Sequence, residues 1–135
     1  MARKTKLGEN VTKLLENLPE EDTFKKKMIM AHAIREMGWR VNPINYPRIK
    51  CYNFWGIMRS GRYRCFKSYQ EALEEYYKVL ERYFPHALEG LNNHNIDTFV
   101  WGLYFGTLGH WAGNAPEKYY QDIKQIYWKL IKQEG

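Results

Sequence analysis

The sequence predicts a mainly α-helical protein with one small irregular lobe between its helices. In several segments apolar residues recur at spacings of three and four, which is the period of a helix with one buried face. Between Trp39 and Lys67 this period is lost, and prolines and a Ser60-Gly61 turn take its place. A chain of 135 residues without an internal repeat has the size of one domain, so we expect a single domain over residues 1–135.

The helices are expected in five places along the chain. A short first helix has apolar positions 11, 14, 15 and 18 and is closed by Pro19. A second has the acids at 20–22 in its first turn and ends at Gly38. The third begins at residues 68–71, Ser-Tyr-Gln-Glu, which have the form of a capping box, and its apolar stripe runs to position 84. A buried helix is expected over 96–108, where Gly102 and Gly106 allow close packing. Pro116 opens a terminal helix with a stripe at 119, 123, 126, 127 and 130.

The second helix carries the residue of greatest chemical interest, Glu36. Nearly every residue from Met28 to Met37 is apolar, so the helix should be buried on most faces, and a carboxylate there loses hydration. The negative end of the helix dipole also disfavours its anion. Both effects predict a raised pKa for Glu36, and a carboxylic acid that keeps its proton near neutrality can protonate a departing sugar oxygen. The alternative is a solvated Glu in a frayed last turn.

Charge and composition narrow the class of partner. The formal net charge of +6 favours an anionic partner such as nucleic acid, an acidic cell wall or a membrane surface. Eleven Tyr and five Trp exceed what a core of this size needs, so some rings should line a groove. The chain contains no run of eighteen apolar residues and its basic start is not followed by an apolar stretch, so we expect neither a membrane span nor a secretory signal.

The cysteines and histidines predict no special chemistry. If the hairpin turns at residues 60–61, Cys65 lies opposite Gly56 and Cys51 lies far down the other arm, so we expect two thiols and no disulfide. The histidines and cysteines lack paired ligand spacing, so we expect no metal site and no cofactor. His32 and Glu36 share a helix face, which indicates a local hydrogen bond or a cleft wall.

Three blocks of sequence occur in a characteristic order. They are residues 33–39 (Ala-Ile-Arg-Glu-Met-Gly-Trp), 53–58 (Asn-Phe-Trp-Gly-Ile-Met) and 109–120, from Gly-His-Trp-Ala to Lys-Tyr-Tyr. In order and spacing they resemble the bacterial and phage glucosaminidases of glycoside hydrolase family 73, over residues 28 to 131. A helical arrangement around a small lobe, with an acid at the end of a buried helix, is also the lysozyme-like (α+β) plan.

The resemblance implies that Glu36 is the catalytic general acid of an enzyme that cleaves peptidoglycan glycan strands, as an endo-N-acetylglucosaminidase or a muramidase. The family's second carboxylate is often assigned to the lobe, but residues 37–70 contain no Asp or Glu. Glu71 is the nearest candidate, and its alternative role is to cap a helix. Assistance by the substrate's 2-acetamido group, or lytic cleavage by a sugar hydroxyl, needs only Glu36.

The residues expected to bind the glycan lie in the lobe and in the third block. They are Tyr52, Asn53, Phe54, Trp55, Tyr63, His110 and Trp111. We expect the Trp55 ring to face the cleft and the protein to act as a monomer. Because no export signal is expected, a phage-encoded hydrolase is the preferred source. Two alternatives stay open, a catalytically inactive glycan-binding or virion structural domain and a basic protein that binds single-stranded nucleic acid.

Overall fold

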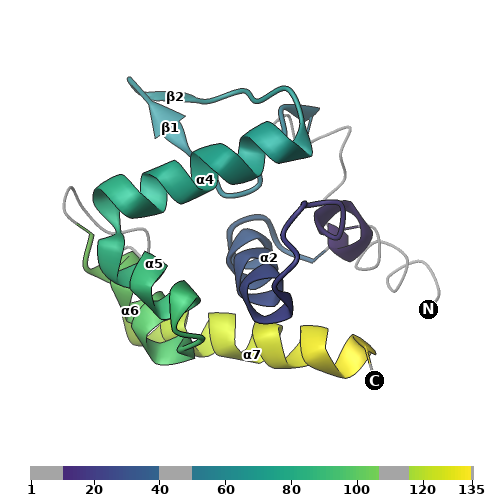
Figure 1. Ribbon diagram of the computed structural model, residues 1–135, viewed down its shortest axis with the longest axis vertical. Helices are drawn as coiled ribbons and strands as arrows, with labels where there is room; N and C mark the ends of the chain where they lie inside the picture. Colours follow the sequence, from purple (N-terminus) through teal and green to yellow (C-terminus); the bar gives the residue numbers. More distant parts are fainter. Residues whose placement is uncertain (1–10, 40–49, 107–115, 135) are drawn as a thin grey trace.

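The computed structural model describes residues 11–39, 50–106 and 116–134. Its elements are α2 (Thr23–Met37), β1 (Met58–Arg59), β2 (Arg62–Tyr63), α4 (Tyr69–Tyr83), α5 (Pro85–Asn92), α6 (Ile96–Tyr104) and α7 (Pro116–Glu134). Residues 11–15 are also helical, as the sequence predicts. In Figure 1, α2 lies between α4 and α7, and the small hairpin of β1 and β2 lies beyond α4. The mainly α prediction with one small lobe is therefore confirmed.

Helix α2 is buried over most of its length. It begins where the Asp22 side chain accepts a hydrogen bond from the Lys25 N–H (2.9 Å), and it ends at Gly38, whose φ of 91° suits glycine. The expectation of acids in its first turn is wrong, because Asp22 is the N-cap and the first turn, from Thr23, holds no acidic residue. Every residue from 27 to 34 is buried. A helix that is apolar nearly all round must be covered on several sides, and this explains its central position.

Helix α4 starts with the predicted cap. The Ser68 hydroxyl accepts a hydrogen bond from the Glu71 N–H at 3.1 Å, and the stripe of Ala72, Leu73, Tyr76 and Leu80 is buried. The helix ends at Tyr83, just before Pro85, because a proline ring cannot follow inside a helix without breaking its hydrogen bonding.

The contact between α5 and α6 depends on two glycines. A Cβ atom added at Gly90 would lie 2.2 Å from the Phe99 backbone nitrogen, and one at Gly102 would lie 2.2 Å from that of Ala87. Only glycine permits this approach, which confirms the packing role predicted for Gly102. The sequence analysis did not predict α5. Helix α6 ends at Tyr104, so the expected extension is wrong at residues 105 and 106, which are not helical; residues 107 and 108 lie outside the described residues.

Helix α7 closes the core on the side opposite α4. It begins at Pro116 as predicted, and it packs along α2. The predicted stripe is buried throughout, at Tyr119, Ile123, Ile126, Tyr127 and Leu130. The prediction of the last helix and of its inward face is therefore confirmed.

The lobe contains the predicted hairpin turn but differs from expectation in its cysteines. Met58 pairs with Tyr63, and residues 60 and 61 both have positive φ, as a two-residue hairpin requires. The expectation of two thiols is wrong, because Cys51 and Cys65 form a disulfide with their Cα atoms 4.5 Å apart. The segment before β1 is not an extended arm. It turns back on itself, so that the Phe66 N–H donates to the Cys51 carbonyl at 2.8 Å.

A candidate catalytic site at the end of helix α2

Glu36 lies in the last turn of α2 with its side chain half-buried. Its Oε2 accepts a hydrogen bond from the Tyr119 hydroxyl at 2.7 Å. Tyr119 comes from the first turns of α7 and is only 3% exposed. The packing of α7 along α2 therefore brings a phenol and a carboxylate together at the edge of the core, although they are 83 positions apart in the sequence.

The Tyr119 hydroxyl is a donor that stays protonated. Burial raises its pKa well above the usual range, and the neighbouring Glu36 carboxylate raises it further. Arg35 lies over the Tyr119 ring, with its guanidinium carbon 4.8 Å from the ring centroid. Arg35 is itself held by an ion pair from its Nε to Asp122 Oδ2 (3.0 Å). A chain of contacts from Asp122 through Arg35 thus holds the ring that binds Glu36.

A second polar pair lies one helical turn deeper. His32 is fully buried, and its Nδ1 forms a hydrogen bond with the Tyr76 hydroxyl at 2.8 Å. Burial, and to a lesser degree the charge of Arg35, lowers the pKa of His32 to about 3, so its ring is neutral at physiological pH. This hydrogen bond runs across to α4 rather than along α2, and burial raises the pKa of Tyr76 as well. Because His32 is fully buried, the alternative that it forms a cleft wall is wrong. A local hydrogen bond between His32 and Glu36 stays a prediction.

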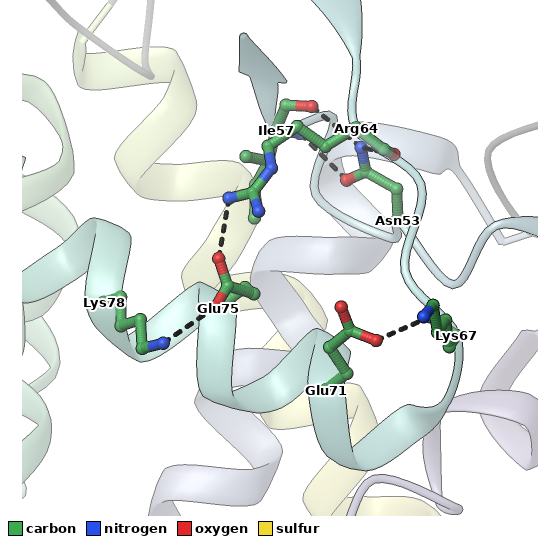
Figure 2. A network of polar contacts seen from close by, with 7 residues as sticks. All are labelled: Asn53, Ile57, Arg64, Lys67, Glu71, Glu75 and Lys78. Carbon is green, nitrogen blue, oxygen red and sulfur yellow. Dashed lines mark hydrogen bonds and ion pairs between the residues drawn. The ribbon is translucent and has the colours of Figure 1, made fainter.

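The carboxylate proposed as a second catalytic group has a structural role. Glu71 Oε2 accepts a hydrogen bond from the Lys67 backbone N–H at 3.0 Å, and Figure 2 shows this carboxylate turned toward the start of its own helix. This contact is the capping interaction that the sequence offered as the alternative. Whether Glu71 also acts in catalysis stays a prediction.

Three of the residues expected to bind the glycan belong to the core. Asn53, Phe54 and Trp55 are between 0% and 1% exposed. The Trp55 ring packs on Tyr76 with centroids 4.3 Å apart, and its indole N–H donates to the Ile29 carbonyl at 3.2 Å. The expectation that Trp55 faces a cleft is wrong. These rings join the lobe to the core, together with the buried side chains of Ile57 and Phe66.

The Asn53 side chain is also structural. It donates to the carbonyls of Ile57 (2.8 Å) and Arg64 (2.9 Å) and accepts from the Ile57 N–H (2.9 Å). Figure 2 shows it between the two sides of the lobe. Asn53 therefore shapes the loop, and a side chain that makes three buried hydrogen bonds has no polar atom to offer a sugar.

The other expected ligands differ in their accessibility. Tyr63 is 56% exposed on β2, so its ring can meet a ligand. Tyr52 is half-buried and packs edge-on against Tyr69, with centroids 5.0 Å apart. His110 and Trp111 lie outside the described residues.

The sequence analysis placed Tyr119 in an apolar stripe and missed its contact with Glu36. A signal for it exists, because a tyrosine on a buried face needs a partner for its hydroxyl. Identifying that partner required knowing which helix packs against α7.

Comparisons of the chain with protein-family models, with curated proteins and with solved structures gave no match. Within the described ranges, no group of three or more His, Cys, Asp and Glu residues is placed to hold a metal ion. In the same ranges, none of the helices has both the length and the apolar character needed to cross a membrane.

Proposed function

We propose that this protein cleaves the glycan strands of bacterial peptidoglycan on a lysozyme-like fold, with Glu36 as the general acid. The observation that carries the proposal is the contact between Glu36 and Tyr119. A carboxyl group at the end of a buried helix is held in one orientation by a buried phenol, at the boundary between core and surface. The sequence resemblance to family 73 glucosaminidases supports the same assignment.

In this reaction the protonated Glu36 donates its proton to the glycosidic oxygen as the bond from that oxygen to the sugar C1 breaks. The positive charge that develops on the ring is then taken by an attacking oxygen. Tyr119 acts as a positioning residue, because its hydrogen bond to Oε2 fixes the orientation of the carboxyl group. Fixing a catalytic group in its reactive orientation lowers the entropic part of the barrier.

A mechanism with one acid fits the contacts of the lobe. The Glu71 carboxylate caps α4, and Glu75 is held by Arg64 (2.8 Å) and Lys78 (3.1 Å). We therefore propose that the attacking oxygen comes from the substrate, either from its 2-acetamido group or from a sugar hydroxyl. Tyr63, exposed on the hairpin, is the ring that we expect to stack on a sugar face.

The disulfide between Cys51 and Cys65 supports action outside the cytoplasm, because disulfides persist in oxidising compartments. We propose the bacterial cell wall as the place of action and a phage as the source. The polymer itself is then the only partner that the activity requires.

The test of the proposal replaces Glu36 by Gln, which is nearly isosteric and cannot donate the proton. Digestion of purified peptidoglycan should slow by at least about a hundredfold, the usual contribution of a general acid. Glu81→Gln is the matched control, because Glu81 is exposed on α4 and the same change should leave the rate unaltered. Wild-type rates from Glu36→Gln would refute the assignment. Mass spectrometry of borohydride-reduced products identifies which bond is cut.

A second variant tests Tyr119 as a positioning residue. Tyr119→Phe keeps the ring and removes the hydroxyl that stabilises the Glu36 anion. Glu36 should then hold its proton to higher pH, so the alkaline limb of the rate profile should move to higher pH while the maximal rate falls. A profile identical to that of the wild type would show that the hydroxyl does not act on the catalytic group.

A further inference from the structure

A pocket of about 220 Å³ lies between the hairpin and α4. Its polar lining consists of four cationic side chains and one carboxylate, which we call the basic pocket: Arg59, Arg64, Lys78, Arg82 and Glu75. In Figure 1 the hairpin of β1 and β2 lies alongside α4. The feature is separate from the candidate catalytic site, because Glu36 is not among the residues that line it.

Two of the four cations are held in place by the single carboxylate. Glu75 Oε1 pairs with Arg64 Nη1 at 2.8 Å and Oε2 pairs with Lys78 Nζ at 3.1 Å, as Figure 2 shows. Hydrogen bonds from Lys78 and Arg64 lower the pKa of Glu75, so it is ionised at neutral pH. Four positive charges against one negative leave three uncompensated in one small pocket.

Two of the three arginines of the pocket, Arg64 and Arg82, are held by contacts with neighbouring residues. The Arg64 backbone is bound on both sides, its N–H by the Ile57 carbonyl (2.9 Å) and its carbonyl by the Asn53 amide (2.9 Å). The Arg82 guanidinium lies over the Tyr83 ring, 5.5 Å from its centroid. A guanidinium that is already oriented loses less entropy when it binds an oxyanion.

Arg59 and Arg82 have side chains that a ligand can reach. Arg59 and Arg82 are exposed, and neither forms an ion pair with any residue that the structure describes. Two exposed guanidinium groups without an ion-pair partner, beside two cations paired with Glu75, match the planar and bidentate geometry of phosphate oxygens.

We propose that the basic pocket binds a phosphate group of the kind repeated along the phosphodiester polymers attached to peptidoglycan. A ligand with a single carboxylate would neutralise only one of the three remaining positive charges. A phosphodiester polymer carries a further negative charge at each repeat. The wall polymer as the source of the phosphate rests on the proposed function, but phosphate binding by the pocket does not. Bound there, the polymer would hold the enzyme beside its substrate.

The experiment is a calorimetric titration with two probes, inorganic phosphate and a poly(glycerol phosphate) chain. The pocket variant is Arg59→Gln combined with Arg82→Gln. The matched control is Lys13→Gln combined with Lys132→Gln, which removes the same charge from exposed sites elsewhere. Binding should weaken about tenfold or more in the pocket variant, the effect of losing charge-assisted hydrogen bonds, and less than about twofold in the control.

The possible outcomes separate the sources of the ligand. Binding of both probes, lost only in the pocket variant, supports the wall polymer. If inorganic phosphate binds and the polymer does not, the pocket is a site for free phosphate, and the proposal that it binds the wall polymer is refuted. The proposal is also overturned if neither probe binds, if acetate competes equally well, or if a single-stranded oligonucleotide binds more tightly than the polymer through the same arginines.

The proposed function and this inference fail separately, because titration requires no turnover. Repeating it with the Glu36→Gln protein should give wild-type phosphate binding. An inactive wild-type enzyme with intact phosphate binding would contradict the proposed function alone. An active enzyme that binds no phosphate would contradict the pocket assignment alone.

Discussion

Replacing Asn53 by Ala should destabilise the whole lobe, although the residue lies in a loop and is polar. Asn53 is fully buried, and its amide joins the two sides of the lobe through the backbone of Ile57 and Arg64. Alanine keeps the Cβ and removes all three of these hydrogen bonds.

The size of the effect follows from the contacts. Each buried hydrogen bond contributes about 1 kcal/mol net, so three together contribute about 3 kcal/mol. Backbone groups of Ile57 and Arg64 that stay buried without a partner add a further cost. We therefore expect Asn53→Ala to lower the free energy of unfolding by about 3–5 kcal/mol.

Urea denaturation followed by tryptophan fluorescence measures this loss, and Tyr63→Ala is the control within the same lobe. Tyr63 is exposed, so its removal should change the free energy of unfolding by no more than about 0.5 kcal/mol while weakening the binding of chitooligosaccharides. A loss below about 1 kcal/mol for Asn53→Ala would refute the structural role. It would return Asn53 to the set of candidate ligands.

Three further predictions concern stability. The pKa of His32 is about 3 in the fold and about 6.5 in the unfolded chain, so the unfolded chain takes up the proton first as the pH falls. In urea titrations this contribution to the free energy of unfolding should be fully present above pH 6.5, and the free energy should be about 3 kcal/mol lower at pH 4. The same slope in His32→Gln would contradict that cause. Gly90→Ala places a Cβ 2.2 Å from the Phe99 nitrogen, so it should reduce the free energy of unfolding by about 3 kcal/mol and lower the melting temperature. An unchanged melting temperature would show that α5 and α6 can move apart without cost. Reducing the Cys51–Cys65 disulfide, which closes a loop with a sequence separation of 14, should cost about 3 kcal/mol in urea; no effect of reductant would refute this.

The sequence by itself determined the principal helices and their buried faces. The cap at Ser68 and the stripe that begins at Tyr119 are local signals, because a helix makes its hydrogen bonds and orients its side chains within a few residues. It also determined that Glu36 ends a helix buried over most of its length. For the same reason the hairpin turn at residues 60–61 could be placed from two adjacent residues.

Short helices and close contacts between helices were harder to predict from the sequence. Helix α5 has eight residues, so its apolar stripe is too short to stand out from its surroundings. The packing of Gly90 against Phe99 becomes evident only when α5 and α6 lie together, although Gly102 by itself indicated a close approach.

Only the tertiary structure decided which polar and aromatic residues of the lobe face inward. Trp55 has basic and polar neighbours in the sequence, yet it is covered by α2 and by Tyr76. The disulfide forms because the chain folds back around Asn53, and the partner of Glu36 comes from a helix more than eighty residues away. Local periodicity reports the face of an element but not the element that covers it, because burial is decided by contacts between segments that are distant in the chain.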